Sequence, residues 1–365
     1  MFACEVRRRM DATSQALMFS GNDAVGTAYR TAASRRWWAL VCAMLLMVVG
    51  VLLDTATGPA MLPVSLVAQA VLGAPVDGSV QAIVWSIRLP VALTALVVGA
   101  SLGLSGAIMQ TILNNPLASS YTLGISAGAG FGAALVIVLG ASLPVPEAYA
   151  IPLNAMLFAG LACSGVYLIG GARRASAEGL VLAGIALLFL FQAMTSLLQM
   201  VASPESLQQI VFWLFGSLQK AGWTKLWIML AVLLACIPWL IADVWRLTAL
   251  KLGDARASAL GVNVRALRLR SFVLISALTG VAVAFVGTIG FVGLVAPHVA
   301  RMLAGEDQRG FLPLSALCGA VLLSLASVAS KTISPGAIFP IGIVTSLIGV
   351  PFFIGLVLRT RRVYW

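Results

Sequence analysis

The residues that could support chemistry are few in this chain, and their spacing fits no enzyme site. Gly21-Asn-Asp-Ala-Val-Gly26-Thr27 has the glycine spacing of a phosphate-binding loop but lacks the lysine that would reach the phosphates of a nucleotide. The single histidine, His298, belongs to no H-E-x-x-H pair, and the five cysteines include no C-x-x-C pair. We therefore expect that the chain is not an enzyme, hydrolyses no ATP itself and binds no metal or cofactor.

Four polar residues recur within a long apolar stretch at positions i, i+3, i+4 and i+7: Gln192, Thr195, Ser196 and Gln199. This spacing places them on one face of a helix. Such a face is either a weakly polar wall along which a bulky ligand moves or a source of hydrogen bonds to neighbouring helices. The residue types fit both interpretations.

One long segment of mixed charge, about 245–269, separates two apolar stretches. Within it we expect Asp254 to be the N-cap of a short helix over residues 255–260, and Gly261 to end that helix. Gly253 and Gly261 would then act as hinges on its two sides. A short helix that projects between hinges suits docking to a soluble partner, and a plain solvated loop is the alternative.

These residues must be positioned by membrane-spanning helices. The chain of 365 residues is 61% hydrophobic and 10% charged, with a mean hydropathy of +1.03, which is unlike a soluble domain. A spanning helix needs roughly 20 mostly apolar residues, and about ten stretches qualify or come close. We place them at about 37–53, 90–111, 118–140, 148–170, 178–202, 223–243, 270–287, 291–304, 311–330 and 340–358. The fold class is therefore all-α and polytopic. The eighth stretch is too short to span alone, and its Pro297 favours a broken or partly re-entrant helix.

The positive charges predict the orientation. When ten spans are counted with both termini inside, all but four of the 23 Lys and Arg residues fall on the cytoplasmic side, where such residues accumulate. The exceptions are Arg88, Lys220, Lys225 and Lys331. Residues 1–36 then form a cytoplasmic tail and residues 37–365 a transmembrane domain. The net charge of +11 is a topology signal and does not indicate nucleic-acid binding.

The two halves of the chain share one spacing, in which three glycines and a proline recur after the same displacement. Gly99, Gly106, Pro116 and Gly124 correspond to Gly280, Gly287, Pro297 and Gly305. This pairs spans two to five with spans seven to ten. Because an odd number of spans separates equivalent elements, the second copy would cross the membrane upside down, as in the inverted repeats of transporters.

The predicted spans contain almost no Asp, Glu, Lys or Arg. Proton- and ion-coupled carriers usually bury such groups as relays, so an autonomous secondary transporter is disfavoured, although it stays an alternative. An intramembrane enzyme is disfavoured too, because no nucleophile, base and metal ligands occur together. The energy for transport must then come from another chain.

Ordered motifs run along the chain from about Arg88 to Leu358. They include Arg88-Leu-Pro90, Asn115-Pro-Leu-Ala118, Phe212-Trp-Leu-Phe-Gly-Ser217, Leu252-Gly-Asp-Ala-Arg256, Leu260-Gly-Val-Asn-Val264 and Gly290-Phe-Val-Gly-Leu-Val-Ala-Pro-His-Val-Ala-Arg301. With these motifs the chain resembles the permease subunits of type II ABC importers for iron siderophores, haem and vitamin B12. The residues before Arg88 lie outside the resemblance.

The resemblance implies roles for the residues singled out above. The segment at 245–269 would hold the coupling helix that contacts an ATPase subunit, with the coupling residues Gly253, Asp254, Arg256, Ser258 and Gly261. The helix that carries Gln192, Thr195, Ser196 and Gln199 would border the translocation path.

The resemblance also implies that Arg88 and Lys331 dock a binding protein through their charge. Three positions depart from the family pattern at that surface. The second arginine of the first motif is Val91, the acidic residue four positions before Lys331 is Ser327, and an acidic position is Ile338.

The partners implied are a second permease copy, two ATP-binding subunits that carry the ATP, and a periplasmic or lipid-anchored substrate-binding protein. The permease would lie in the inner membrane of a bacterium, in contact with lipid, with both termini in the cytoplasm. The run Asn115-Pro-Leu-Ala-Ser-Ser-Tyr-Thr-Leu-Gly-Ile-Ser126 favours an iron(III) siderophore as the ligand. Haem and vitamin B12 are the alternative ligands.

Overall fold

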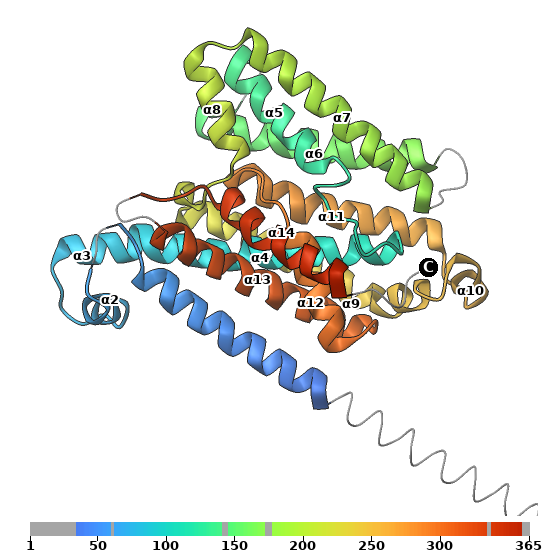
Figure 1. The fold of residues 1–365 in the computed structure, drawn as a ribbon, viewed down its shortest axis with the longest axis horizontal. Helices are drawn as coiled ribbons and strands as arrows, with labels where there is room; N and C mark the ends of the chain where they lie inside the picture. The colour runs from blue at the N-terminus through green and yellow to red at the C-terminus, as the bar shows by residue number, and fades with distance from the viewer. Residues whose placement is uncertain (1–33, 60–61, 141–144, 172–176, 334–336, 360–365) are drawn as a thin grey trace, which may run out of the picture.

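The computed structural model describes residues 34–59, 62–140, 145–171, 177–333 and 337–359. Within them the chain is a bundle of helices without β-strands, as the sequence predicts (Figure 1). The N-terminal helix covers Ser34–Ala56. It is followed by α2 (Val64–Val71), α3 (Gly78–Ala82), η1 (Ile83–Arg88), α4 (Leu89–Ile112), α5 (Ile125–Leu139), α6 (Glu147–Gly171), α7 (Ala177–Val201), α8 (Pro204–Leu214), η2 (Leu218–Lys220), α9 (Trp223–Leu250), α10 (Asp254–Ala259), α11 (Val264–Val286), α12 (Val292–Ala304), α13 (Gln308–Thr332) and α14 (Ile341–Arg359). The predicted tail, 1–36, lies almost wholly outside the described residues.

Seven described helices are long and apolar enough to cross a membrane, and three shorter apolar helices cover Ile125–Leu139, Val292–Ala304 and Ile341–Gly355. Each predicted span corresponds to one of these helices. In the eighth span Pro297 lies inside α12 without interrupting it, so the predicted break is wrong. The helix instead begins abruptly after Phe291, whose φ is 65°. With 13 residues, α12 has a length of about 20 Å, short of a bilayer core.

Some elements differ from the prediction. The third span starts later than expected, at Ile125, because the residues after α4 form turns that contain the positive φ angles of Asn114 (44°) and Gly124 (76°). The short helices α2, α3 and α8 were not predicted. A local signal for α8 exists, since the Ser203 hydroxyl accepts a hydrogen bond from the backbone N–H of Ser206 and Pro204 occupies the first turn.

The core is built around α4, which packs against α9, α11, α12 and α13. Its most apolar window, within Gly78–Ile112, is 83% buried, compared with 22% for the N-terminal helix. Glycines allow α4 and α13 to touch backbone to backbone, because a Cβ added at Gly319 would lie 2.1 Å from the carbonyl oxygen of Gly99. Small residues serve this purpose in membrane helices, where lipid offers no hydrophobic drive for association.

Equivalent helices of the two predicted repeats have equivalent packing partners, as an inverted repeat requires. α4 packs on α13 as α11 packs on α6, and α5 packs on α6 as α12 packs on α13. The equivalent helices α4 and α11 are antiparallel, since Arg268 near the start of α11 donates to the carbonyl oxygen of Ile112 at the end of α4. Gly280 of α11 faces α6, as Gly99 of α4 faces α13.

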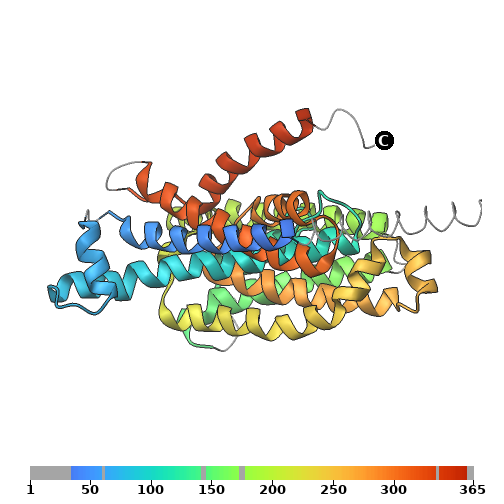
Figure 2. The same cartoon turned by 90° about the horizontal axis from the view of Figure 1, so that it is seen from below.

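The two ends of the bundle differ. α2, α3 and η1 lie at one end, the left of Figure 1, which we call the η1 end; α10 lies at the other, the α10 end. Arg35 and Arg36 donate to the carbonyl oxygens of Met302 and Ala304, and Glu306 just beyond pairs with Lys251 before α10. The N-terminal helix therefore begins at the α10 end. Figure 2 shows this helix (blue) running along the bundle and α14 (red) leaving it at an angle.

Candidate functional site

α10 is held between two glycines with left-handed backbone conformation. The φ angle is 95° at Gly253 and 83° at Gly261, a region that favours glycine. Gly253 is the N-cap and Asp254 the first helical residue, so the predicted N-cap role of Asp254 is wrong by one position. The reason is that the Asp254 carboxylate pairs with a side chain instead of capping the helix. The helix ends directly before Leu260 and Gly261, close to the predicted stop.

Asp254 ties α10 to two core helices. Its carboxylate oxygens lie 2.9 and 3.0 Å from two nitrogens of the Arg268 guanidinium, on α11. The same guanidinium donates through Nε to the carbonyl oxygen of Ile112, 3.3 Å away at the end of α4. Arg268 is buried, whereas the Asp254 side chain is about half exposed. α10 is therefore linked through Arg268 to both α4 and α11.

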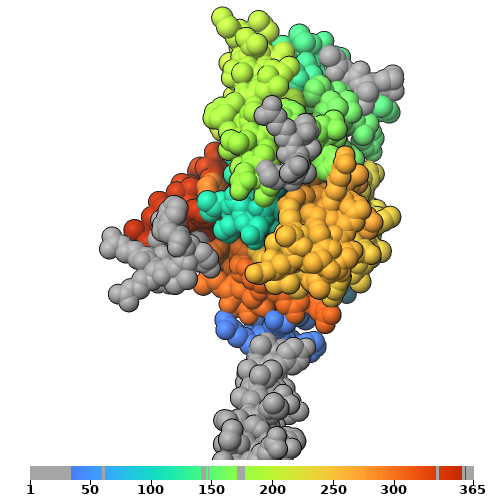
Figure 3. Space-filling view, turned by 90° about the vertical axis from the view of Figure 1, so that its right-hand side faces the viewer, coloured from blue at the N-terminus to red at the C-terminus, as the bar shows by residue number. Residues whose placement is uncertain are grey.

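The opposite face of α10 is free for contact with another molecule. Ala257 is fully buried and fixes the inner face, while Arg256 and Ser258 are exposed. Leu252 and Leu260, on either side of the helix, expose 53% and 52% of their surface. These two leucines were missed in the sequence, although apolar residues within a polar segment were a possible signal. Figure 3 looks onto this end and shows the gold surface of α10 and its neighbours.

A second ionic network lies beside α10. The Glu306 carboxylate, in the turn between α12 and α13, lies 3.3 Å from Lys251 Nζ and 3.0 Å from Arg301 Nε. Lys251 also donates to the side-chain oxygen of Asn114, at 3.0 Å, and Arg301 to that of Gln110, also at 3.0 Å. The residues just before α10 are thus linked to both α12 and the end of α4.

The four polar residues predicted on one face of α7 line a single cavity. Gln192, Thr195, Ser196 and Gln199 enclose about 360 Å³ together with residues from α5, the segment before it, the end of α8 and the segment after α11. The other lining residues are Tyr121, Ser126, Ala127, Leu188, Leu214 and Thr288. All ten are uncharged. The wall offers hydroxyl and amide groups for hydrogen bonds. Two of the hydroxyls already donate to backbone carbonyl oxygens, Thr195 to that of Phe191 at 2.7 Å and Thr288 to that of Leu214.

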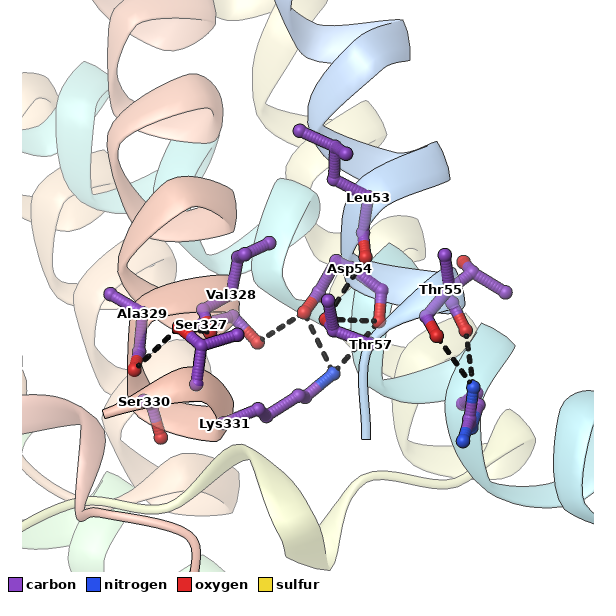
Figure 4. Close-up of polar contacts among 12 residues, drawn as sticks. Leu53, Asp54, Thr55, Thr57, Ser327, Val328, Ala329, Ser330 and Lys331 are labelled. Atoms are coloured by element: carbon purple, nitrogen blue, oxygen red, sulfur yellow. Dashed lines mark hydrogen bonds and ion pairs between the residues drawn. The ribbon is translucent and has the colours of Figure 1, made fainter. Parts of the chain in front are cut away.

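Arg88 and Lys331 both lie at the η1 end, but their side chains are buried. Figure 4 shows Lys331 beside Asp54. Lys331 Nζ lies 2.7 Å from Oδ1 of Asp54 on the N-terminal helix, and the Ser327 hydroxyl donates to the same oxygen at 2.8 Å. Arg88 Nη1 donates to the carbonyl oxygens of Thr55 and Ala56, at 3.2 and 2.8 Å. Both cations thus engage the N-terminal helix in this structure. Sequence reasoning missed Asp54, which stands at the end of an apolar run and far from Lys331 in the chain.

The predicted residues therefore form three separate groups: the residues predicted for ATPase coupling at the α10 end, the polar wall along α7, and two buried cations at the η1 end. Residues 44–359 match the FecCD transport family. The chain belongs to this family. The match extends well before Arg88 and so includes most of the N-terminal helix, which the sequence resemblance did not reach.

Relatives of this chain carry names that refer to different ligands. The haemin transport permease HmuU of Yersinia pestis is 41% identical over 76% of this chain and 84% of its own length. The molybdate import permease MolB of Haemophilus influenzae is 38% identical over 79% and 84%. A solved inward-facing structure of an ABC transporter assigned to the metal-chelate type has 35% identity and a TM-score of 0.78, with 88% of this chain and 98% of that chain covered.

The family membership establishes the general role. The chain is a multi-pass membrane permease subunit of a type II ABC importer, in which ATP hydrolysis belongs to separate subunits and the ligand is delivered by a binding protein. Because close relatives carry haemin and molybdate in their names, membership does not fix the ligand.

Proposed function

We propose that this permease carries an iron(III) siderophore across the inner membrane. The observation that supports this ligand is the composition of the α7 cavity, whose lining residues are uncharged and rich in hydroxyl and amide groups. A small oxyanion such as molybdate would favour cationic donors, and a haem would favour a largely apolar wall. A bulky, polar, many-oxygened chelate fits a wall of weak hydrogen-bonding groups along which it can move without being held.

The cavity belongs to one copy of the chain, and we propose that a second copy faces it to complete the path. Two ATP-binding subunits would dock at the α10 end, which then lies in the cytoplasm with both termini of the chain. The binding protein would dock at the η1 end. The charge distribution supports this orientation, because Arg35, Arg36, Lys251 and Arg301 gather at the α10 end.

The coupling segment would transmit ATP-driven motion through α10. Arg256 and Ser258, with Leu252 and Leu260, present a mixed polar and apolar face that suits a groove on an ATPase subunit. Gly253 and Gly261 separate α10 from the helices before and after it, and the Asp254–Arg268 pair connects α10 to α4 and α11. The permease would then rock between two packing arrangements of its helices, while ATP hydrolysis takes place only on the partner subunits.

The coupling residues divide into two roles that can be separated. Arg256→Glu should lower co-purification of the ATPase subunits about tenfold, because it reverses a charge at the contact. Asp254→Asn should leave that contact largely intact but release α10, which increases amide hydrogen exchange over residues 252–263 about fivefold. Arg265→Glu, the same charge change on the exposed start of α11, is the matched control. Equal losses of binding for Arg256→Glu and Arg265→Glu would refute a specific role for Arg256.

The polar wall is tested with the double variant Gln192→Leu/Gln199→Leu. We expect uptake to fall about tenfold, as when roughly one hydrogen bond to the moving ligand is lost. Light scattering should still give the mass of two permease copies, and Leu197→Ala, an exposed position on the same helix, should leave uptake unchanged. Normal uptake would instead favour hydrogen bonds between helices as the role of this face, and a single-copy mass would contradict the homodimer.

The docking role of Arg88 and Lys331 stays a prediction. Since the side chains of both are buried, they would act on a binding protein either through their electrostatic field or after release from the N-terminal helix. Reversing both charges to Glu should weaken binding-protein affinity at low salt and less so at high salt. Lys220→Glu changes an exposed cation at the same end and is the control. Unchanged affinity at low salt for the double reversal would exclude the role.

The ligand is tested by uptake in iron-starved cells with and without this chain. Radiolabelled ferric siderophores of several chemical types, haem, vitamin B12 and molybdate are offered in turn. We expect selective loss of one ferric siderophore. Loss of haem, vitamin B12 or molybdate alone would keep the importer but replace the proposed ligand.

A further inference from the structure

The N-terminal helix is attached to the bundle along a narrow line. Its exposed apolar residues include Leu45, Leu46, Val48, Val49, Leu52 and Leu53. On its inner side, a Cβ added at Gly50 would lie 3.3 Å from Cβ of Ser324, so the helix approaches α13 closely at this point. Apolar packing of this kind does not by itself fix how a helix is placed, because lipid covers an apolar surface equally well.

Polar contacts hold the helix at its α10 end. Arg36 Nη1 lies 2.7 Å from Oδ2 of Asp307, the residue directly before α13, and Arg36 Nε donates to the carbonyl oxygen of Ala304 at 3.0 Å. Arg35 donates to the carbonyl oxygen of Met302 at 2.7 Å. Two arginines thus bind the last carbonyls of α12, where the helix dipole favours cations.

Polar contacts also hold the helix at its η1 end, where the helix supplies the anion instead of the cation. Asp54 is fully buried and pairs with Lys331, whose Nζ also donates to the Asp54 carbonyl oxygen at 3.0 Å. Arg88 binds the last carbonyls of the N-terminal helix itself. Figure 4 shows Asp54 between Lys331 and the Ser327 hydroxyl. Its second oxygen, Oδ2, accepts no hydrogen bond from any described residue, so the charge of Asp54 is balanced mainly by Lys331.

The two ion pairs have opposite polarity. The helix supplies a cation to Asp307 at the start of α13 and an anion to Lys331 near its end. A reversed helix would place like charges together at both ends. A slip of one turn would separate both pairs and leave Asp54 buried without a counter-charge, which is strongly unfavourable. The pairs therefore admit one direction and one register.

We propose that the Ser34–Ala56 helix is a strut, locked in one register along α13 by Arg36–Asp307 and Asp54–Lys331, that moves with α13 as one body during transport. Asp54 is then a positioning residue, and Lys331 serves first to hold this helix. The strut joins the turn between α12 and α13, beside the Lys251–Glu306 network, to the opposite end of α13.

The register of the N-terminal helix on α13 is measured by the rate at which a disulfide forms between Gly50→Cys and Ser324→Cys. The five native cysteines of the chain are replaced for this experiment. The Cβ separation of 3.3 Å at these positions lies just below the range of about 3.5–4.5 Å in disulfides, so a small outward shift of either backbone brings the two sulfurs into bonding geometry. In the assembled complex, Asp54→Asn should slow oxidative cross-linking about tenfold. The charge exchange Asp54→Lys/Lys331→Asp should restore the rate to within about twofold.

The matched control is Asp54→Ala/Ser327→Asp. Ser327 precedes Lys331 by one helical turn on α13, so the new carboxylate neutralises Lys331 from α13 itself. Alanine at 54 removes the side chain of the N-terminal helix that position 327 contacts in the native chain. We expect thermal stability to recover while cross-linking stays slow. Fast cross-linking in Asp54→Asn, or recovery of fast cross-linking when Ser327→Asp is added, would contradict the proposed strut. Either result would show that the Asp54–Lys331 pair balances a buried charge but does not position the helix.

The one-body motion has its own test, which rests on the proposed coupling to ATPase subunits. The cross-linked complex should keep its ATPase activity within about twofold of the reduced complex, because the disulfide joins parts that do not move apart. Loss of activity on oxidation, regained on reduction, would show that the helix slides on α13 and would refute this motion. The cross-linking rates do not depend on the proposed function, so the two failures are distinguishable.

Discussion

The close approach of α4 and α13 is the constraint on which the rest of the structure depends. At Gly99, Gly103 and Gly319 the two backbones are in direct contact, and any side chain would collide with main-chain atoms. In lipid, where apolar residues gain nothing from leaving the solvent, such contacts supply van der Waals energy that holds helices together. α4 can lie at the centre only because its neighbours come this near. The helices that surround it are then packed in two related sets, α5–α6 with α11 and α12–α13 with α4.

This centre leaves few places for polar groups. Charges in a membrane protein are tolerated where they are paired or lie at the ends, and the described charges follow that rule. Arg268 and Asp254, Lys251 and Glu306, and Arg301 and Glu306 lie at the α10 end, whereas Asp54 and Lys331 lie at the η1 end. Between the ends, the α7 cavity holds neutral groups only among its lining residues. Directional interactions are therefore concentrated at the two ends where we propose that partners dock, and the cavity between them is lined by neutral groups.

The sequence predicted most of what depends on local pattern. Apolar runs of sufficient length located the spans, glycines 253 and 261 located the ends of α10, and helical spacing placed Gln192 and Gln199 on one wall. What it could not predict depends on packing between distant segments. Asp54 and Lys331 are 277 positions apart, and no local pattern pairs them. Burial of Arg88 is equally invisible, because two of its partners are backbone carbonyls of another helix, which carry no side-chain signal.

The pairing of Asp54 with Lys331 also explains how the chain tolerates Ser327. A carboxylate at 327 would lie one turn from Lys331 on the same helix and balance its charge locally. Here the balancing carboxylate comes from another helix, and Ser327 supports it with a hydrogen bond. The electrostatic requirement at Lys331 is met in either arrangement. Only the arrangement present here also ties two helices together. The serine at 327 thus gives up an ion pair within α13, and the chain has instead an ion pair between α13 and the N-terminal helix.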